Sequence, residues 1–140
     1  MSVVRAEVSD QPLSVEEHRL AVDRPDAGAV AVFAGVVRDH DHGRAVTALE
    51  YEAHPSAAAT LRSVAEQLLA KDPEVRAIAL SHRVGSLAIG DIALVAAVSS
   101  PHRAEAFAAL ERLVDEVKAQ VPVWKRQVFA DGTEEWVNCA

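Results

Sequence analysis

The 140-residue sequence contains a single cysteine, Cys139, which excludes an internal disulfide and a metal site with several cysteine ligands. Long apolar runs are also missing, because none reaches the roughly 18 residues that a membrane-spanning helix needs. Residues 1–10 carry acidic side chains and alternating valines instead of the apolar core of a signal peptide. We therefore expect a cytoplasmic protein that does not associate with membranes.

Positive charge is scarce as well, and the formal net charge is −7. This balance argues against general affinity for nucleic acid or an anionic membrane surface, since both need a basic face. It leaves room for one local basic pocket that binds an acidic small molecule. Hydrophobic residues make up 50% of the chain, which is too many for a disordered protein. Without an internal repeat or a break in composition, we expect one domain over residues 1–140.

Apolar periodicity predicts seven strands and three helices. The strands are expected over residues 3–8, 29–37, 46–53, 75–84, 91–99, 123–129 and 135–137, and the helices over 14–22, 56–71 and 100–121. The continuous apolar run 29–37 is typical of a strand buried on both faces. Ser14 is expected to cap the first helix, and Ser100 with Pro101 to open the third. The order of elements predicts an α+β domain with a largely antiparallel sheet.

The third predicted helix carries a lysine beside its apolar stripe. The stripe is expected to contain Phe107, Leu110, Val114, Val117 and Val121, and Lys118 falls about 20° around the helix from Phe107. A lysine at the edge of the core is partly desolvated, which favours a neutral amine that can transfer protons or attack an electrophile. The alternative is that its stem covers the core edge while its charge stays in water.

A second lysine, Lys125, follows the end of this helix. Pro122 turns the chain out of the helix soon after Lys118, so the two lysines can converge on one pocket, with Trp124 as a possible wall. The alternative is a basic edge strand that discourages aggregation.

The start of the same helix is a second candidate site. Ser99, Ser100, His102 and Arg103 surround a helix N-terminus, where free N–H groups and the helix dipole bind anions. Capping alone explains the serines, but not the positive charges in the first turn. Arg38, at the exit of the apolar strand, is a further basic candidate, although a lone arginine there is more often a surface residue.

The segment Asp39-His40-Asp41-His42-Gly43 alternates acids and imidazoles, which are ligands for zinc and related ions. Neighbours in one loop rarely form a complete site, so we expect no metal. The residues alone thus predict an anion pocket with two lysines and name no reaction.

Several motifs, in order, resemble the large, catalytic subunit of molybdopterin synthase. They are FAGVVR at Phe33–Arg38, LEYEA at Leu49–Ala53, HRVG at His82–Gly85, SSPHR at Ser99–Arg103 and VPVWKR at Val121–Arg126. The resemblance extends from about Gly28 to Val137. It implies an α/β hammerhead-type fold with an additional antiparallel β subdomain, and no cofactor.

The resemblance also implies a reaction and its partners. Two dithiolene sulfurs are installed on cyclic pyranopterin monophosphate, and they come from the C-terminal Gly-Gly thiocarboxylate of a small ubiquitin-like subunit. Two large subunits form a central dimer with a small subunit at each end. By position, Lys118 and Lys125 match the catalytic lysines, and Arg38, His102, Arg103 and Lys125 match residues that bind the substrate.

Two rival hypotheses remain open beside this one. The first is a non-catalytic scaffold that keeps the fold and binds a ubiquitin-like partner. The second is an enzyme of another class that uses Cys139 as its own sulfur carrier. The chain ends in Asn138-Cys139-Ala140, so it cannot itself be the Gly-Gly donor.

Overall fold

The computed structural model describes residues 1–138, and Cys139 lies outside them. Its main sheet has the order β1-β5-β7-β2. The strands are β1 (Ser2–Ser9), β5 (Ala77–Arg83), β7 (Ile92–Ser100) and β2 (Ala29–Val36). Only the β1–β5 pair is parallel, so the sheet is largely antiparallel, as predicted.

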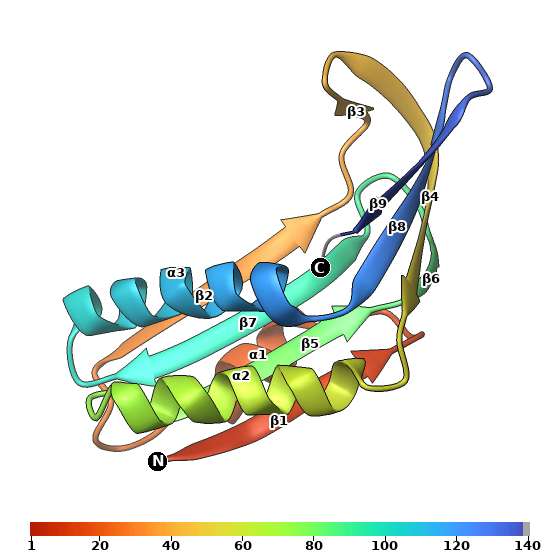
Figure 1. Ribbon diagram of the computed structural model, residues 1–140. Coiled ribbons are helices and arrows are strands. Elements are labelled where there is room, and N and C mark those ends of the chain that lie inside the picture. The colour runs from red at the N-terminus through yellow and green to blue at the C-terminus, as the bar shows by residue number, and fades with distance from the viewer. Residues whose placement is uncertain (139–140) are drawn as a thin grey trace.

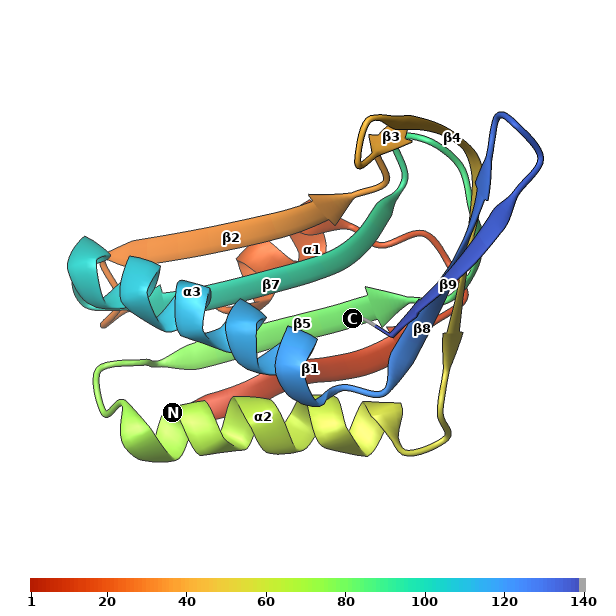
Figure 2. The same ribbon diagram turned by 45° about the horizontal axis from the view of Figure 1, so that its top comes forward.

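Three helices cover the two faces of this sheet (Figures 1 and 2). Helices α2 (Ala57–Lys71) and α3 (Arg103–Gln120) lie on one face, and α1 (Val15–Ala21) lies on the other. As predicted, the Ser14 side chain accepts a hydrogen bond from the Glu17 amide and caps α1. The third helix begins later than predicted, because His102, and not Ser100, is its N-cap residue.

The inner strands β5 and β7 form the centre of the core. Alternate side chains point to opposite faces, so Ile78 and Leu80 pack toward α2 and α3, whereas Ala77 and Ala79 pack in a smaller cluster with Val22. The prediction that strand 29–37 is buried on both faces is wrong. β2 is an edge strand, with Val30 and Val36 exposed, and β5 and β7 have the doubly buried positions.

The buried face of α3 also differs from the prediction. Its buried residues are Ala106, Ala109, Leu113 and Val117, whereas Phe107 is 66% exposed. Small alanine side chains let the helix approach the sheet closely, which turns the larger Phe107 outward. Since Lys118 lies on nearly the same side of the helix as Phe107, it is exposed too, and the expected partial desolvation of Lys118 is wrong.

A second sheet extends from one end of the first (Figure 1). It contains β3 (His40–Asp41), β4 (Arg44–Ala53), β8 (Val123–Phe129) and β9 (Glu134–Asn138), and β6 (Gly85–Leu87) also pairs with β4. β3 and β4 are joined by His42 and Gly43, which have φ values of 50° and 77°. Two consecutive positive φ angles are typical of a tight hairpin turn, and glycine adopts them without strain.

The predicted fold class is confirmed by this arrangement of three helices and two sheets and by its solved structural relatives, reported below. The ten predicted elements are all present, and the short strands β3 and β6 are additional. Among residues 1–138, no helix has the length and apolarity to cross a membrane.

Candidate active site

The junction of the two sheets is built around one face of β8. Val123, Lys125, Gln127 and Phe129 alternate along this strand and point to its more buried side. In the β4–β8 register, Tyr51 lies opposite Lys125, so both side chains are on the same face. Trp124 points to the other face, and the expectation that it forms a wall beside Lys125 is therefore wrong.

The hairpin after β2 brings Arg38 to this face through Asp41. The buried Gln127 side chain donates a hydrogen bond from Nε2 to Oδ2 of Asp41 at 2.8 Å. The other oxygen, Oδ1, accepts from the Arg38 guanidinium at 3.3 Å. The Gln127 hydrogen bond holds the pKa of Asp41 below its ordinary value, and the nearby charge of Lys125 adds to this effect although burial opposes it. Asp41 thus remains an anion beside Lys125 and orients Arg38.

Lys118 reaches the same region from the end of α3. Tyr51 makes an edge-to-face contact with His82, with ring centroids 4.9 Å apart. His82 is fully buried, and burial lowers its pKa to about 4, with a further contribution from the positive charge of Lys118. A series of contacts and electrostatic effects, through Asp41, Tyr51 and His82, therefore links the surroundings of Arg38, Lys125 and Lys118. We call these three residues the basic junction.

The basic junction concentrates positive charge in a chain whose formal net charge is −7. Lys118 and Arg38 are exposed and Lys125 is half-buried, so all three can be reached by a ligand. Such a cluster is suited to an anionic substrate, and a lysine amine can act as acid, base or nucleophile.

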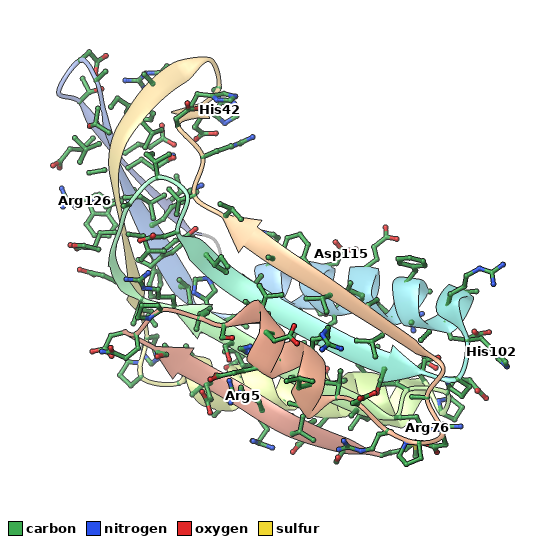
Figure 3. The ribbon with its side chains drawn as sticks, turned by 180° about the vertical axis from the view of Figure 1, so that it is seen from behind. Arg5, His42, Arg76, His102, Asp115 and Arg126 are labelled. Atoms are coloured by element: carbon green, nitrogen blue, oxygen red, sulfur yellow. The ribbon has the colours of Figure 1, made fainter. Side chains whose placement is uncertain are left out.

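His102 and Arg103 lie elsewhere. Figure 3 shows His102 at one end of the molecule, whereas Arg126 and His42 are at the opposite end with the second sheet. Arg103 and Lys118 belong to the two ends of α3, and fifteen residues at 1.5 Å each separate them by roughly 22 Å. Within one chain, the helix start is therefore not part of the basic junction.

Asp41 and His40, in the acid- and histidine-rich segment 39–43, make separate contacts. Asp41 points inward to Gln127, while the exposed His40 pairs with Asp39 at 2.9 Å. Within residues 1–138, no three His, Cys, Asp or Glu side chains are gathered as metal ligands.

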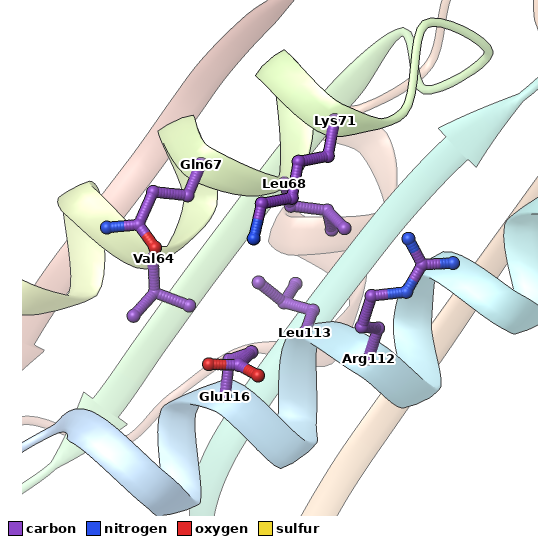
Figure 4. A pocket seen from close by; sticks show the side chains of 7 residues that line it. All are labelled: Val64, Gln67, Leu68, Lys71, Arg112, Leu113 and Glu116. Carbon is purple, nitrogen blue, oxygen red and sulfur yellow. The ribbon is translucent and has the colours of Figure 1, made fainter.

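Two hollows differ in their relation to the basic junction. A small cavity of about 40 Å³ lies between α2 and α3, with Val64, Leu68 and Leu113 around it and Lys71 and Arg112 at its edge (Figure 4). It has room for about one water molecule, so it cannot hold a pterin-sized ligand. A groove of about 470 Å³ opens beside Tyr51 and is lined also by His54, Ala58 and Gly85. The groove has the size of a ligand site, and Tyr51, which lines it, lies opposite Lys125 of the junction.

Four polar residues of the site were not singled out from the sequence for this role. The sequence presents Tyr51 and His82 only as parts of motifs and Asp41 only as a candidate metal ligand, and it gives no separate sign of Gln127. Alternation along β8 places Gln127 beside Lys125, so the strand pattern contained a signal for that residue. The others depend on the register of β4 and on the β3–β4 turn.

The α+β frame and the basic junction place the chain in a class of hammerhead-type proteins that carry a local cluster of cations suited to an anionic ligand. The MoaE protein family matches this chain over residues 8–120. The molybdopterin synthase catalytic subunit 1 of Mycobacterium tuberculosis is 45% identical over 132 residues, which cover 94% of this chain and 88% of that protein.

Solved structures agree with this match. The molybdopterin synthase structure from Staphylococcus aureus superimposes with a TM-score of 0.87 at 36% identity, covering 94% of this chain and 95% of that one. The complex of subunits 1 and 2 of molybdopterin-converting factor from Helicobacter pylori contains a chain with the same fold, which superimposes with a TM-score of 0.68 at 21% identity. The superposition covers 94% of this chain and 88% of that one.

The chain belongs to the MoaE family, the family of molybdopterin synthase catalytic subunits. The resemblance stated from the sequence motifs is thereby confirmed, and so is the expectation of an enzyme.

Proposed function

We propose that this chain transfers sulfur from the C-terminal thiocarboxylate of a small ubiquitin-like subunit to cyclic pyranopterin monophosphate and so forms the dithiolene of molybdopterin. The observation that carries this proposal is the basic junction, in which Asp41 accepts a hydrogen bond from Arg38 and is within range of the charge of Lys125. The charge of Lys118 acts in the same way on His82, whose ring contacts Tyr51 opposite Lys125. Both reactants are anionic, so a local cluster of cations in an acidic chain favours their encounter.

The three cations differ in surroundings, which suggests different roles. Lys118 is exposed at the end of α3, where its amine can move toward the reacting carbon as acid, base or transient covalent partner. Lys125 is half-buried beside Asp41, which suits a fixed electrostatic role. Arg38 is oriented by Asp41 and can hold a phosphate with its guanidinium.

The sulfur donor is a partner chain in this proposal. The groove beside Tyr51 offers an entry for a narrow C-terminal tail, because Tyr51 lines the groove and lies opposite Lys125 in the β4–β8 pair. The Helicobacter pylori fold relative occurs in a complex with its second subunit, which is consistent with this arrangement.

The position of His102 and Arg103 favours a dimer as the working unit. The resemblance assigns both residues to the substrate pocket, yet one chain keeps them roughly 22 Å from Lys118. A second copy can supply the missing helix start. The exposed Phe107, Val30 and Val36, on α3 and the free edge strand β2, provide apolar surface for such an association. We therefore propose a central dimer with a small subunit at each end, working in the cytoplasm.

The principal test is incubation of the chain with the cyclic pterin precursor and a thiocarboxylated small subunit, followed by detection of the dithiolene product. Lys118→Ala should abolish product formation and leave partner binding intact. Near-normal turnover by this variant would remove the assigned role of Lys118. A wild-type chain that binds the partner without forming product would support the scaffold hypothesis. Unchanged turnover by Cys139→Ser would remove the hypothesis of an internal sulfur carrier.

The proposal that each active site combines Lys118 of one subunit with Arg103 of the other is tested by mixing two inactive variants. Lys118→Ala and Arg103→Ala each damage both sites of their own homodimer. In a mixed dimer, one site carries both substitutions and the other carries neither, so random mixing should restore about a quarter of wild-type activity. If each site is built within one chain, every site keeps one lesion, and mixing restores nothing.

A further inference from the structure

His82 is a buried histidine with one bonded ring nitrogen and one without a partner. The residue is fully buried at the end of β5. Its Nδ1 lies 2.7 Å from the main-chain oxygen of Arg83, and a carbonyl oxygen can only accept, so Nδ1 carries the proton. Nε2 therefore holds a lone pair, and it has no hydrogen-bond partner among residues 1–138.

An acceptor left unsatisfied in the interior is unfavourable, and native proteins seldom retain one without a reason. The other buried histidine, His18, shows the ordinary solution. Its Nδ1 donates to the Ser14 carbonyl oxygen at 2.6 Å, and its Nε2 accepts from the Ser81 hydroxyl at 2.7 Å. Both rings are buried, but only that of His82 has an unused acceptor.

The surroundings of His82 show which donor could use this lone pair. Tyr51 from β4 contacts the ring, and Lys118 from α3 is close enough for its charge to lower the pKa of His82. The neighbouring Arg83 side chain is directed to Asp91, at 3.3 Å. Lys118 is thus the cation that acts on the ring.

Burial and Lys118 together keep His82 neutral near pH 7, because its pKa is lowered to about 4. A neutral imidazole adds no repulsive charge to the basic junction, and it offers a lone pair to an ammonium group. Lys118 has three N–H donors on a flexible stem, so it can bond to His82 and to another group at the same time.

We propose that Nε2 of His82 accepts a hydrogen bond from the Lys118 ammonium when substrate occupies the basic junction, and that His82 is thereby a positioning residue for Lys118. This inference rests on the proposed function of the junction. It adds a residue that does not touch the substrate but fixes the amine that does. A misplaced catalytic group can lower turnover by about a hundredfold, so the effect of losing such a contact should be measurable.

The test compares His82→Leu and His82→Gln with the matched control His18→Leu. Leucine fills much of the ring volume and removes the unsatisfied Nε2, which offsets the loss of the Nδ1 hydrogen bond to Arg83, so the His82→Leu chain should fold with a stability close to that of wild type. Its kcat should nevertheless fall about ten- to a hundredfold, with a much smaller change in KM. His82→Gln, which restores an acceptor, should recover part of kcat. His18→Leu should lower stability and leave kcat of the folded protein unchanged.

Equal kcat values for wild type and a folded His82→Leu would overturn the inference. A kcat of His82→Gln no higher than that of His82→Leu would overturn it as well. If the wild type itself forms no dithiolene with precursor and thiocarboxylated partner, the proposed function fails instead.

A second measurement does not depend on turnover or on the His82 variants. In ¹⁵N spectra, addition of the cyclic pterin precursor should move the Nε2 resonance of His82 toward the hydrogen-bonded position in wild type, but not in Lys118→Ala. A resonance that moves equally in both proteins, or in neither, contradicts the assigned contact.

Discussion

Acidification should destabilise this protein through His82, even before its carboxylates are protonated. The folded protein lowers the pKa of this histidine from 6.5 to about 4, first because the ring is buried and then because Lys118 is positive. In the unfolded chain the ring regains its ordinary pKa. Between pH 6.5 and pH 4 the unfolded state therefore binds more protons than the folded state, and stability falls as the pH falls.

The size of the effect follows from the shift. Each pKa unit corresponds to about 1.4 kcal/mol, so the His82 contribution to the free energy of unfolding should decrease by about 2 kcal/mol by pH 5 and about 3 kcal/mol by pH 4. The His82 contribution to the free energy of unfolding is fully present above pH 6.5, and this contribution should decrease little further below pH 4. For a small protein whose total stability is about 5–15 kcal/mol, this is a large fraction.

Urea unfolding of wild type and His82→Leu at pH 7, 5 and 4 measures this contribution. The variant retains His18 and all carboxylates, so their titration largely cancels in the difference between the two proteins. The stability of His82→Leu relative to wild type should rise by about 3 kcal/mol from pH 7 to pH 4. A difference that does not change with pH would show that His82 is not held neutral by the fold, and the reasoning would be refuted.

Two further perturbations test the site and the core. Asp41→Asn keeps the shape but removes the anion that pairs with Arg38 at 3.3 Å, and since Arg38 is exposed, KM for the phosphate-bearing substrate should rise only about two- to fivefold. Steady-state kinetics would show this, and a large drop in kcat with unchanged KM would contradict the positioning role of Asp41. Leu113→Ala, at a fully buried position between α3 and the sheet, should lower the free energy of unfolding by about 2–5 kcal/mol. Denaturant titration would measure it, and a loss below about 1 kcal/mol would contradict the packing described for Leu113.

Much of the fold could be predicted from periodicity because the helices and longer strands each bury a regular set of side chains. The errors have physical causes. A continuous apolar run does not distinguish an inner strand from the edge strand β2, since both can be rich in valine and alanine. Strands of two and three residues, such as β3 and β6, are too short to show a period.

The buried face of α3 shows a different limit. The large apolar residues of α3 predict a buried stripe that includes Phe107. In the structure Phe107 is exposed, and the smaller Ala106 and Ala109 pack against the sheet. A helix that carries both alanines and larger apolar residues has two plausible faces, and its position against the strands decides between them.

The candidate site was predictable only in part. The motifs indicated Lys118, Lys125 and Arg38, but the contacts between them depend on long-range pairing. Tyr51 reaches Lys125 through the β4–β8 register, and Asp41 reaches Gln127 across 86 positions of sequence. Such contacts leave no local pattern, and so the supporting residues become visible only in the folded chain.

The number of residues in helix α3 cannot easily change, because it fixes the position of Lys118 relative to the helix start. It is a rod of 18 residues with Arg103 at its first position and Lys118 near its last turn. Inserting one residue in its middle would advance Lys118 by about 1.5 Å and turn it by about 100° relative to the helix start. The exposed turn at residues 130–133, by contrast, can accept insertions without moving the junction. Natural variation in length should therefore collect in the turns of the second sheet, while α3 keeps its residue count.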